Sequence, residues 1–161
     1  MIADPRVRVL QVIGSLNIGG AEAVLSQLAT GLNPDEFDVS VCCTRAAGPV
    51  AERLRSQGVV VRVAASPRRA FRHLTILGLV QHVRQARAHI VHTHGSTALV
   101  QAGPLGGFRY LPPWIHTFHY GNYPYPKAPS LQSSIERWMS PFPRQLVAVS
   151  EFEKRPGRLW V

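Results

Sequence analysis

The chain has 161 residues, which suits one domain with a proper core and leaves little room for two. Hydrophobic residues make up 45% and charged residues 17%, a globular composition that excludes a disordered chain. No apolar run approaches the roughly 20 residues of a membrane-spanning helix, and the first residues lack the pattern of a secretory signal. We therefore expect a cytoplasmic protein, either soluble or peripheral on the inner face of the membrane.

The formal net charge of +9 is distributed unevenly. Residues 1–64 carry equal numbers of basic and acidic residues, whereas residues 65–161 carry twelve Lys and Arg against three acids. No Asp or Glu occurs between Glu52 and Glu136. This asymmetry predicts a face that meets something anionic: a membrane surface, a phosphate-bearing substrate or nucleic acid. A compositional bias toward arginine, which supplies sixteen of the eighteen bases, is the alternative explanation.

Hydrophobic periodicity divides the first half of the chain into short elements. They are predicted, in chain order, as strand, helix, strand, helix and strand at residues 7–13, 20–32, 38–44, 49–57 and 59–63. Asn33 and Pro34 stop the first helix, and Gly58 is placed to cap the second. Cys42 and Cys43 are adjacent in the second strand, so a disulfide between them would be strained, and we expect two small buried residues.

The second half continues the alternation. Its elements are predicted as helix, strand, helix, strand, helix and strand at residues 71–88, 89–92, 96–105, 114–118, 131–139 and 145–149. Gly106 and Gly107 are expected to form a turn. Six strands alternating with helices predict an α/β fold, a Rossmann-like doubly wound parallel sheet of about six strands. Ligands of such sheets bind at the carboxyl ends of the strands, so the residues there are the candidates for chemistry.

A Gly-Gly pair follows the first strand. Gly19 and Gly20 stand where the first helix begins, and free N–H groups with the positive end of a helix dipole favour a phosphate there. Glu22, in the first turn, could cap the helix. The spacing matches neither the dinucleotide fingerprint nor a Walker loop, so a plain structural turn is an equal alternative.

Four histidines follow two neighbouring strands: His92, His94, His116 and His119. A His-x-His pair places two imidazoles on one strand face, as a metal site would require. No nearby carboxylate completes such a site, so we expect no metal and favour histidines that donate hydrogen bonds to a sugar hydroxyl or a phosphate.

Other candidates lie near the last two strands. Ser150 and Glu151 follow the sixth strand, where Ser150 could simply cap the next helix. Aromatic residues surround a proline-rich loop and form either a packing cluster or a platform for a sugar or lipid acceptor; they are Tyr120, Tyr123, Tyr125 and Trp138.

These pieces together resemble the N-terminal domain of the retaining glycosyltransferase family 4, which is one half of a GT-B fold. The resemblance runs from about residue 7 to 155 and is carried by four motifs in the family's order. They are Val12-Ile13-Gly14 through Gly19-Gly20-Ala21-Glu22, His89-Ile90-Val91-His92-Thr93-His94, Ile115-His116-Thr117-Phe118-His119-Tyr120-Gly121, and Val147-Ala148-Val149-Ser150-Glu151.

The resemblance implies roles for these residues. Gly19 and Gly20 would approach the diphosphate of a nucleotide-sugar donor, and His119 looks like the family's cleft histidine that contacts the donor sugar. The acceptor side of the cleft would be lined by Glu22, His94, Ser150 and Glu151. A basic segment is similar to the membrane-facing surface of members that glycosylate lipid-linked acceptors; it holds Arg68, Arg69 and Arg72. The implied reaction needs no cofactor besides the donor substrate.

The sequence departs from the family in one large respect. Family members continue with a second domain that binds the nucleotide, whereas this sequence stops at Val161. We therefore expect residues 1–161 to be a single N-terminal domain without the donor-binding half, inactive alone and awaiting a missing domain or a partner chain. The alternatives are a basic anion- or nucleic-acid-binding α/β module without catalysis, which a salt titration would reveal, and a metal hydrolase, which metal analysis would reveal.

Overall fold

The computed structural model describes residues 4–64, 74–107, 110–119 and 131–149. Within these ranges the strands are β1 (Val7–Ser15), β2 (Phe37–Ala46), β3 (Val60–Val63), β4 (Ile90–His94), β5 (Trp114–Phe118) and β6 (Gln145–Ala148). The helices are α1 (Gly20–Gly31), α2 (Pro49–Ser56), α3 (Leu74–Gln85), α4 (Gly95–Gly107) and α5 (Leu131–Met139). No helix among these residues is long and apolar enough to cross a membrane.

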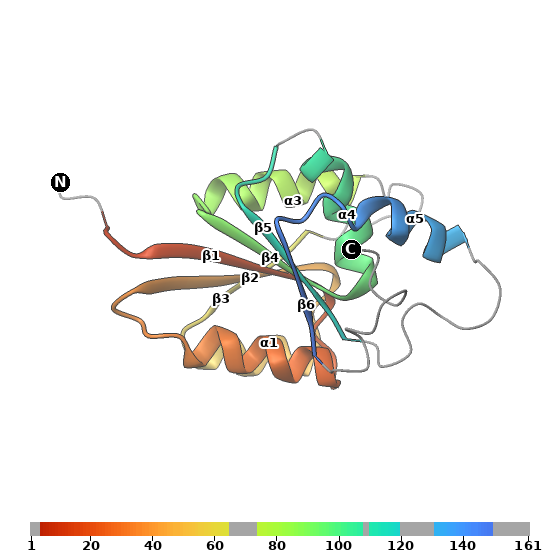
Figure 1. The fold of residues 1–161 in the computed structure, drawn as a ribbon. Helices are drawn as coiled ribbons and strands as arrows, with labels where there is room; N and C mark the ends of the chain where they lie inside the picture. The colour runs from red at the N-terminus through yellow and green to blue at the C-terminus, as the bar shows by residue number, and fades with distance from the viewer. Residues whose placement is uncertain (1–3, 65–73, 108–109, 120–130, 150–161) are drawn as a thin grey trace.

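All neighbouring strands pair in parallel, in the order β3-β2-β1-β4-β5-β6 (Figure 1). The chain first builds outward from β1 through β2 to β3, and then returns to the other side of β1 with β4. The strand order therefore reverses between β1 and β4, where sheets of this kind open a crevice for ligands. This topology confirms the predicted Rossmann-like doubly wound sheet.

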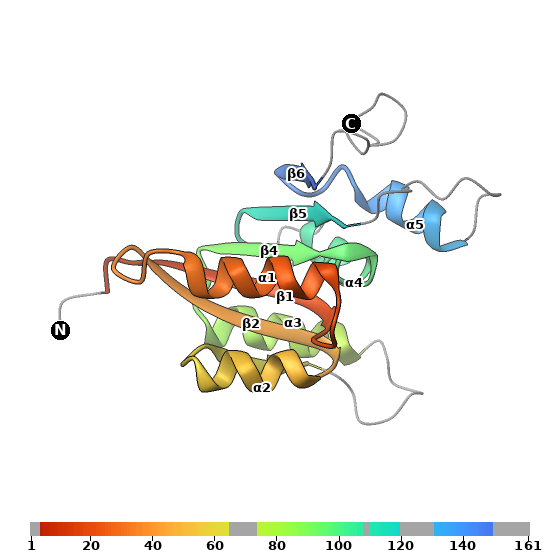
Figure 2. The same ribbon diagram turned by 90° about the horizontal axis from the view of Figure 1, so that it is seen from below.

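Helices cover the sheet in two layers. Figure 1 shows α3, α4 and α5 on one face and α1 on the other, and Figure 2 shows α2 beside α1. The α3–α5 side packs on a core of Leu10, Val12, Val91, Trp114 and Phe118 from the strands. Ile13, Val41 and Cys43 point the other way and pack against α1 and α2. Side chains of alternate strand residues thus pack into two separate hydrophobic cores, one on each face of the sheet, as the two-residue period of a strand requires.

The second helix ends as its sequence predicts. Gly58 has a φ of 84°, and the N–H groups of Gly58 and Val59 donate to the carbonyls of Arg55 and Leu54 at 3.0 Å each. This is the Schellman arrangement, in which a left-handed residue after the helix satisfies the last carbonyls. Arg87 takes the same position after α3 with a φ of 46°, although it is not glycine.

Among the boundaries that differ from the prediction, the ends of α4 and α3 have a physical reason in the structure. The turn expected at Gly106 and Gly107 is wrong: both residues belong to α4. A Cβ atom at Gly106 would lie 2.6 Å from ring atoms of Trp114, so the absent side chain lets the helix continue against the indole. The third helix ends at Gln85, three residues before the predicted end, because Arg87 turns the chain into the left-handed region.

The adjacent cysteines behave as predicted. Cys42 and Cys43 are both free and both fully buried, one in each core. Burial raises the pKa of each thiol to about 12, so neither is a reactive thiolate at neutral pH.

Candidate functional site at the carboxyl edge of the sheet

The carboxyl ends of the parallel strands meet at one edge of the sheet, and α1 begins at that edge (Figure 1). Gly19 and Gly20 lie between the end of β1 and the body of α1. His94 is the last residue of β4, and His119 directly follows β5. The structure therefore brings these four sequence-predicted residues to the same edge, at or next to the point where the strand order reverses.

The start of α1 is open. Gly19 is the N-cap, and the Ala23 N–H donates to its carbonyl at 3.0 Å. A Cβ atom at Gly20 would meet nothing within 4 Å, and the preceding Ile18 is 87% exposed. The first N–H groups of this twelve-residue helix thus face an accessible surface with the positive end of its dipole.

Glu22 lies beside this helix start without capping it. Its Oε2 is so close that a Cβ atom at Gly19 would be 2.5 Å away. Among the described residues, however, no side-chain hydrogen bond caps α1, so the cap that Glu22 could have provided is not formed. The carboxylate extends over the glycine because Gly19 has no side chain to exclude it.

His94 and His119 form a hydrogen-bonded pair. The Nδ1 atom of His94 lies 2.9 Å from Nε2 of His119, and the two rings stack at 5.2 Å between centroids. On its other side, Nε2 of His94 lies 2.7 Å from Oε1 of Gln11 in β1. Gln11 and His94 are each only 1% exposed, whereas His119 is half-buried. The half-buried His119 ring is thus held by the buried His94, whose other ring nitrogen contacts the buried Gln11.

Gln11 is the site residue that the sequence analysis missed. It stands between Leu10 and Val12 in an apolar strand, and a polar side chain in the middle of such a run was the available signal. Register pairs Gln11 with His92, and Ile13 with His94, so these side chains share one face of the sheet.

The four histidines do not form one cluster. His92 and His94 share the α1 face, where Nε2 of His92 lies 2.7 Å from the Thr117 hydroxyl. His116 points to the opposite face and is fully buried, with Nδ1 2.7 Å from the Thr93 hydroxyl. In the part of the chain that the structure describes, no three His, Cys, Asp or Glu side chains gather as a metal site would require.

Burial keeps these imidazoles neutral. Burial, as the largest cause, together with the neighbouring histidines lowers the pKa of His92 to about 4, of His94 to about 2 and of His116 to about 3. The pKa of His119 is also lowered by its partial burial. No carboxylate stands against these rings among the described hydrogen-bond partners, and only a hydrogen bond with Thr93, the smallest of the effects on the pKa of His116, offsets part of the cost of charging that ring.

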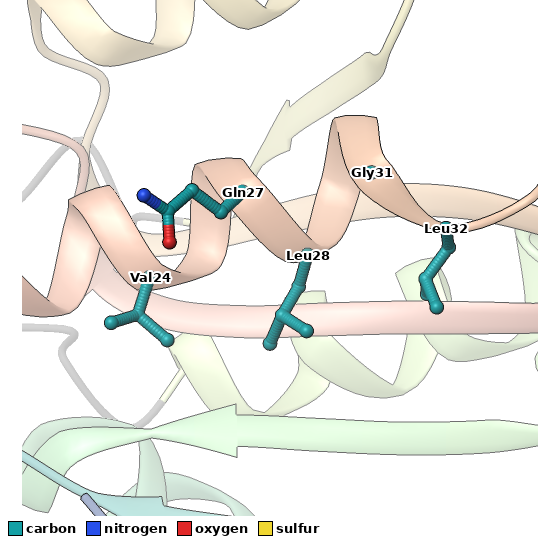
Figure 3. A pocket seen from close by; sticks show the side chains of 5 residues that line it. All are labelled: Val24, Gln27, Leu28, Gly31 and Leu32. Atoms are coloured by element: carbon teal, nitrogen blue, oxygen red, sulfur yellow. The ribbon is translucent and has the colours of Figure 1, made fainter.

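The remaining predicted positions lie outside the described residues. They are Ser150, Glu151, Arg68, Arg69 and Arg72, together with the aromatic residues Tyr120, Tyr123 and Tyr125. Trp138 is described: it is 70% exposed on α5 and meets Phe142 edge-on at 6.3 Å between ring centroids. An open depression of ≈ 250 Å³ runs along the later turns of α1, lined by Val24, Gln27, Leu28, Gly31 and Leu32 (Figure 3). Its lining carries no ionisable side chain, so we do not assign it to the site.

Comparison with known protein families shows to which family the chain belongs. Residues 18–157 match the model of Glycosyltransferase Family 4, and this range holds the helix start and both site histidines. The chain belongs to Glycosyltransferase Family 4. The match favours the transferase prediction over a basic binding module. No curated protein sequence matches the chain.

Solved structures agree on the fold. Anabaena HepE in complex with UDP superposes with a TM-score of 0.72 at 18% identity, over 92% of this chain and 39% of that one. A putative UDP-N-acetylglucosamine 2-epimerase from Listeria monocytogenes gives 0.62 at 15% identity, over 92% and 41%. Acinetobacter baumannii MurG gives 0.58 at 14% identity, over 88% and 41%. The family 4 chain thus spans about two fifths of the length of these proteins and has the fold of one GT-B domain.

Proposed function

We propose that these residues form the acceptor-side half of an enzyme that transfers a sugar from a nucleotide-sugar donor to a sugar or lipid-linked acceptor. The observation that carries the proposal is the convergence of the open α1 start and the His94–His119 pair on one edge of the sheet, in a chain of this family. The relative from Anabaena was solved with UDP, which is the leaving group of a UDP-sugar.

In this proposal each part of the edge has one task. The open start of α1, at Gly19 and Gly20, receives the donor diphosphate, because its N–H groups and helix dipole favour a negative charge. His119 contacts the donor sugar and Glu22 lines the acceptor side, while His94, predicted from the sequence to line that side, is buried and acts there only through its contact with His119. Sugar transfer of this kind depends on positioning and on stabilising the leaving diphosphate, so no cofactor besides the donor is required.

The remaining parts of the proposal rest on the sequence. Arg68, Arg69 and Arg72 form a basic face toward an anionic membrane surface, which would place the enzyme at the inner face of the membrane. Ser150 and Glu151 complete the acceptor side. Because most electrostatic stabilisation of the diphosphate comes from the donor-binding half in this architecture, residues 1–161 alone bind donor weakly and do not turn over.

The test measures donor binding and sugar transfer separately. Purified 1–161 is titrated with UDP-, GDP- and ADP-sugars by ligand-detected NMR, and nucleotide release is followed with and without a donor-binding half supplied on the same or a second chain. We expect weak binding by 1–161 and transfer only with both halves. His119→Ala should lower turnover, whereas His82→Ala on α3 serves as a control that keeps it. Full activity of His119→Ala would contradict the site assignment, and turnover by 1–161 alone would contradict the requirement for a second half.

A further inference from the structure

The hydrogen bonds that join Gln11, His94 and His119 have a direction, which is fixed by the atoms that can only accept. An amide oxygen such as Oε1 of Gln11 accepts hydrogen bonds and cannot donate them. The 2.7 Å contact from Nε2 of His94 to that oxygen therefore requires the proton of His94 to be on Nε2. His94 is neutral, because burial strongly disfavours its charged form, so its Nδ1 carries a lone pair and no proton.

The same reasoning determines which nitrogen of His119 carries a proton. Since Nδ1 of His94 is an acceptor, the 2.9 Å contact with His119 requires Nε2 of His119 to carry the proton and donate it. A neutral imidazole has one N–H, so Nδ1 of His119 is bare. Nδ1 of His119 has no hydrogen-bond partner among the residues that the structure describes.

We propose that Gln11 and His94 are positioning residues that hold His119 in its Nε2–H tautomer, so that a bound sugar hydroxyl donates its hydrogen bond to the bare Nδ1. This deepens the proposed function at the same site and rests on it for the identity of the ligand. It also revises the expectation that the site histidines donate to a sugar hydroxyl or a phosphate. The one N–H of His119 is already used inside the protein, and a bare nitrogen repels an oxyanion while accepting from a hydroxyl.

The geometry explains why two residues are needed. Gln11 and His94 come from adjacent strands whose register is set by the β1–β4 ladder, and both are almost fully buried. Their rotamers are therefore restricted by the packing around them. His119 follows the end of β5 and is half-buried, so without the His94 contact its ring could rotate or exchange its tautomer. The chain of hydrogen bonds from Gln11 through His94 to His119, called the relay below, thus fixes the ring of His119 through two side chains that the sheet itself holds in place.

The direct test is the protonation of the two rings, measured by long-range ¹H–¹⁵N NMR on the unliganded 161-residue chain at neutral pH. The His119 signals are assigned by their loss in His119→Gln. We expect pyrrole-like Nε2 and pyridine-like Nδ1 signals for both His94 and His119. A proton on Nδ1 of His119 would overturn the inference, because it would mean that the Gln11 amide presents its nitrogen and the relay runs the other way.

Variants separate a tautomer relay from simple packing. His94→Asn keeps an amide oxygen near the position of Nδ1 and should preserve the Nε2–H form of His119, whereas His94→Leu offers no acceptor and should give a mixture of both tautomers. If His94→Leu does not fold, Gln11→Met tests the relay one step further away and should also give a mixture. An unchanged His119 tautomer in the folded acceptor-free variants would contradict the relay.

Further measurements distinguish a failure of the tautomer inference from a failure of the proposed function. Inorganic phosphate should leave Nδ1 of His119 unprotonated, and protonation by phosphate would overturn the hydroxyl preference. The expected tautomers in a chain that never transfers sugar with any donor-binding half would support the relay while removing the proposed function. In an active enzyme, His94→Leu should lower kcat more than it raises KM for the donor, and His94→Asn should restore most of the loss.

Discussion

The backbone of Gly48 lies directly against the backbone of Leu16. A Cβ atom at Gly48 would be 2.5 Å from the Leu16 carbonyl oxygen, and the N–H of Val50 donates to that same oxygen at 3.1 Å. Gly48 is the N-cap of α2, and Leu16 opens the segment that leads from β1 to the Gly-Gly start of α1. The absence of one side chain thus lets the two loops at the carboxyl edge interlock.

Gly48→Ala should therefore destabilise the fold. Backbone atoms cannot move aside as a flexible side chain can, so we expect a loss of about 1–3 kcal/mol in the free energy of unfolding, the usual cost of overpacking. Urea unfolding followed by circular dichroism measures it. Gly31→Ala is the matched control, because a Cβ at Gly31 meets nothing within 4 Å. That variant should gain about 0.4–1 kcal/mol from helix propensity and reduced chain entropy. Equal stability of the two variants would contradict the predicted contact.

Gly20→Val should separate binding from folding. Its side chain would enter open space in the free protein, so the midpoint of thermal unfolding should stay close to that of the parent. If the donor diphosphate approaches this backbone, the same side chain should weaken nucleotide-sugar binding by about tenfold or more, which is about 1.4 kcal/mol. Gly31→Val at the far end of α1 should leave binding unchanged. Unimpaired binding by a stable Gly20→Val variant would remove the diphosphate from this helix.

The Thr93 hydroxyl joins two buried side chains. It accepts a hydrogen bond from Nε1 of Trp114 at 2.7 Å and lies 2.7 Å from Nδ1 of His116. Thr93→Val keeps the shape but leaves the indole N–H without its partner, so we expect a loss of about 1–3 kcal/mol in stability. Thr93→Ser keeps the hydroxyl and loses one methyl group, with a smaller loss of about 1 kcal/mol. Chemical unfolding of the pair measures the difference, and Thr93→Ser being the less stable variant would contradict it.

Acid should unfold the protein through its buried histidines. Burial places the folded pKa values of His92, His94 and His116 at about 4, 2 and 3, below those of an unfolded chain. Within the window between the folded and unfolded pKa values, the unfolded state binds more protons, so stability rises with pH there. The stability that these neutral histidines contribute is fully present above the unfolded pKa of about 6.5 and decreases as the pH falls below that value.

The free energy of unfolding should change with pH by up to about 1.4 kcal/mol per pH unit for each such histidine. Urea midpoints at a series of pH values from 7.5 down to 4.5 would show it, and His92→Gln should make the dependence shallower by removing one titrating group. Stability that is independent of pH across this range would mean that the imidazoles are solvated in the folded state.

The sequence by itself determined the local elements. The alternation of apolar runs with helical stripes predicted each strand and helix of the described residues, and Gly58 predicted the end of α2, because periodicity and turn conformation depend on residues close together in the chain. It also identified His94, His119, Gly19 and Gly20 as candidates at the strand ends, since the carboxyl ends of parallel strands share an edge.

Tertiary structure decided which of these residues meet. Gln11, His94 and His119 are separated by tens of residues and become neighbours through the strand order and register, which no local pattern specifies. The same register turned His116 to the opposite face, and the contact with Trp114 extended α4 through Gly106. A period of two residues says that side chains alternate, but the pairing of strands decides what each alternate side chain touches.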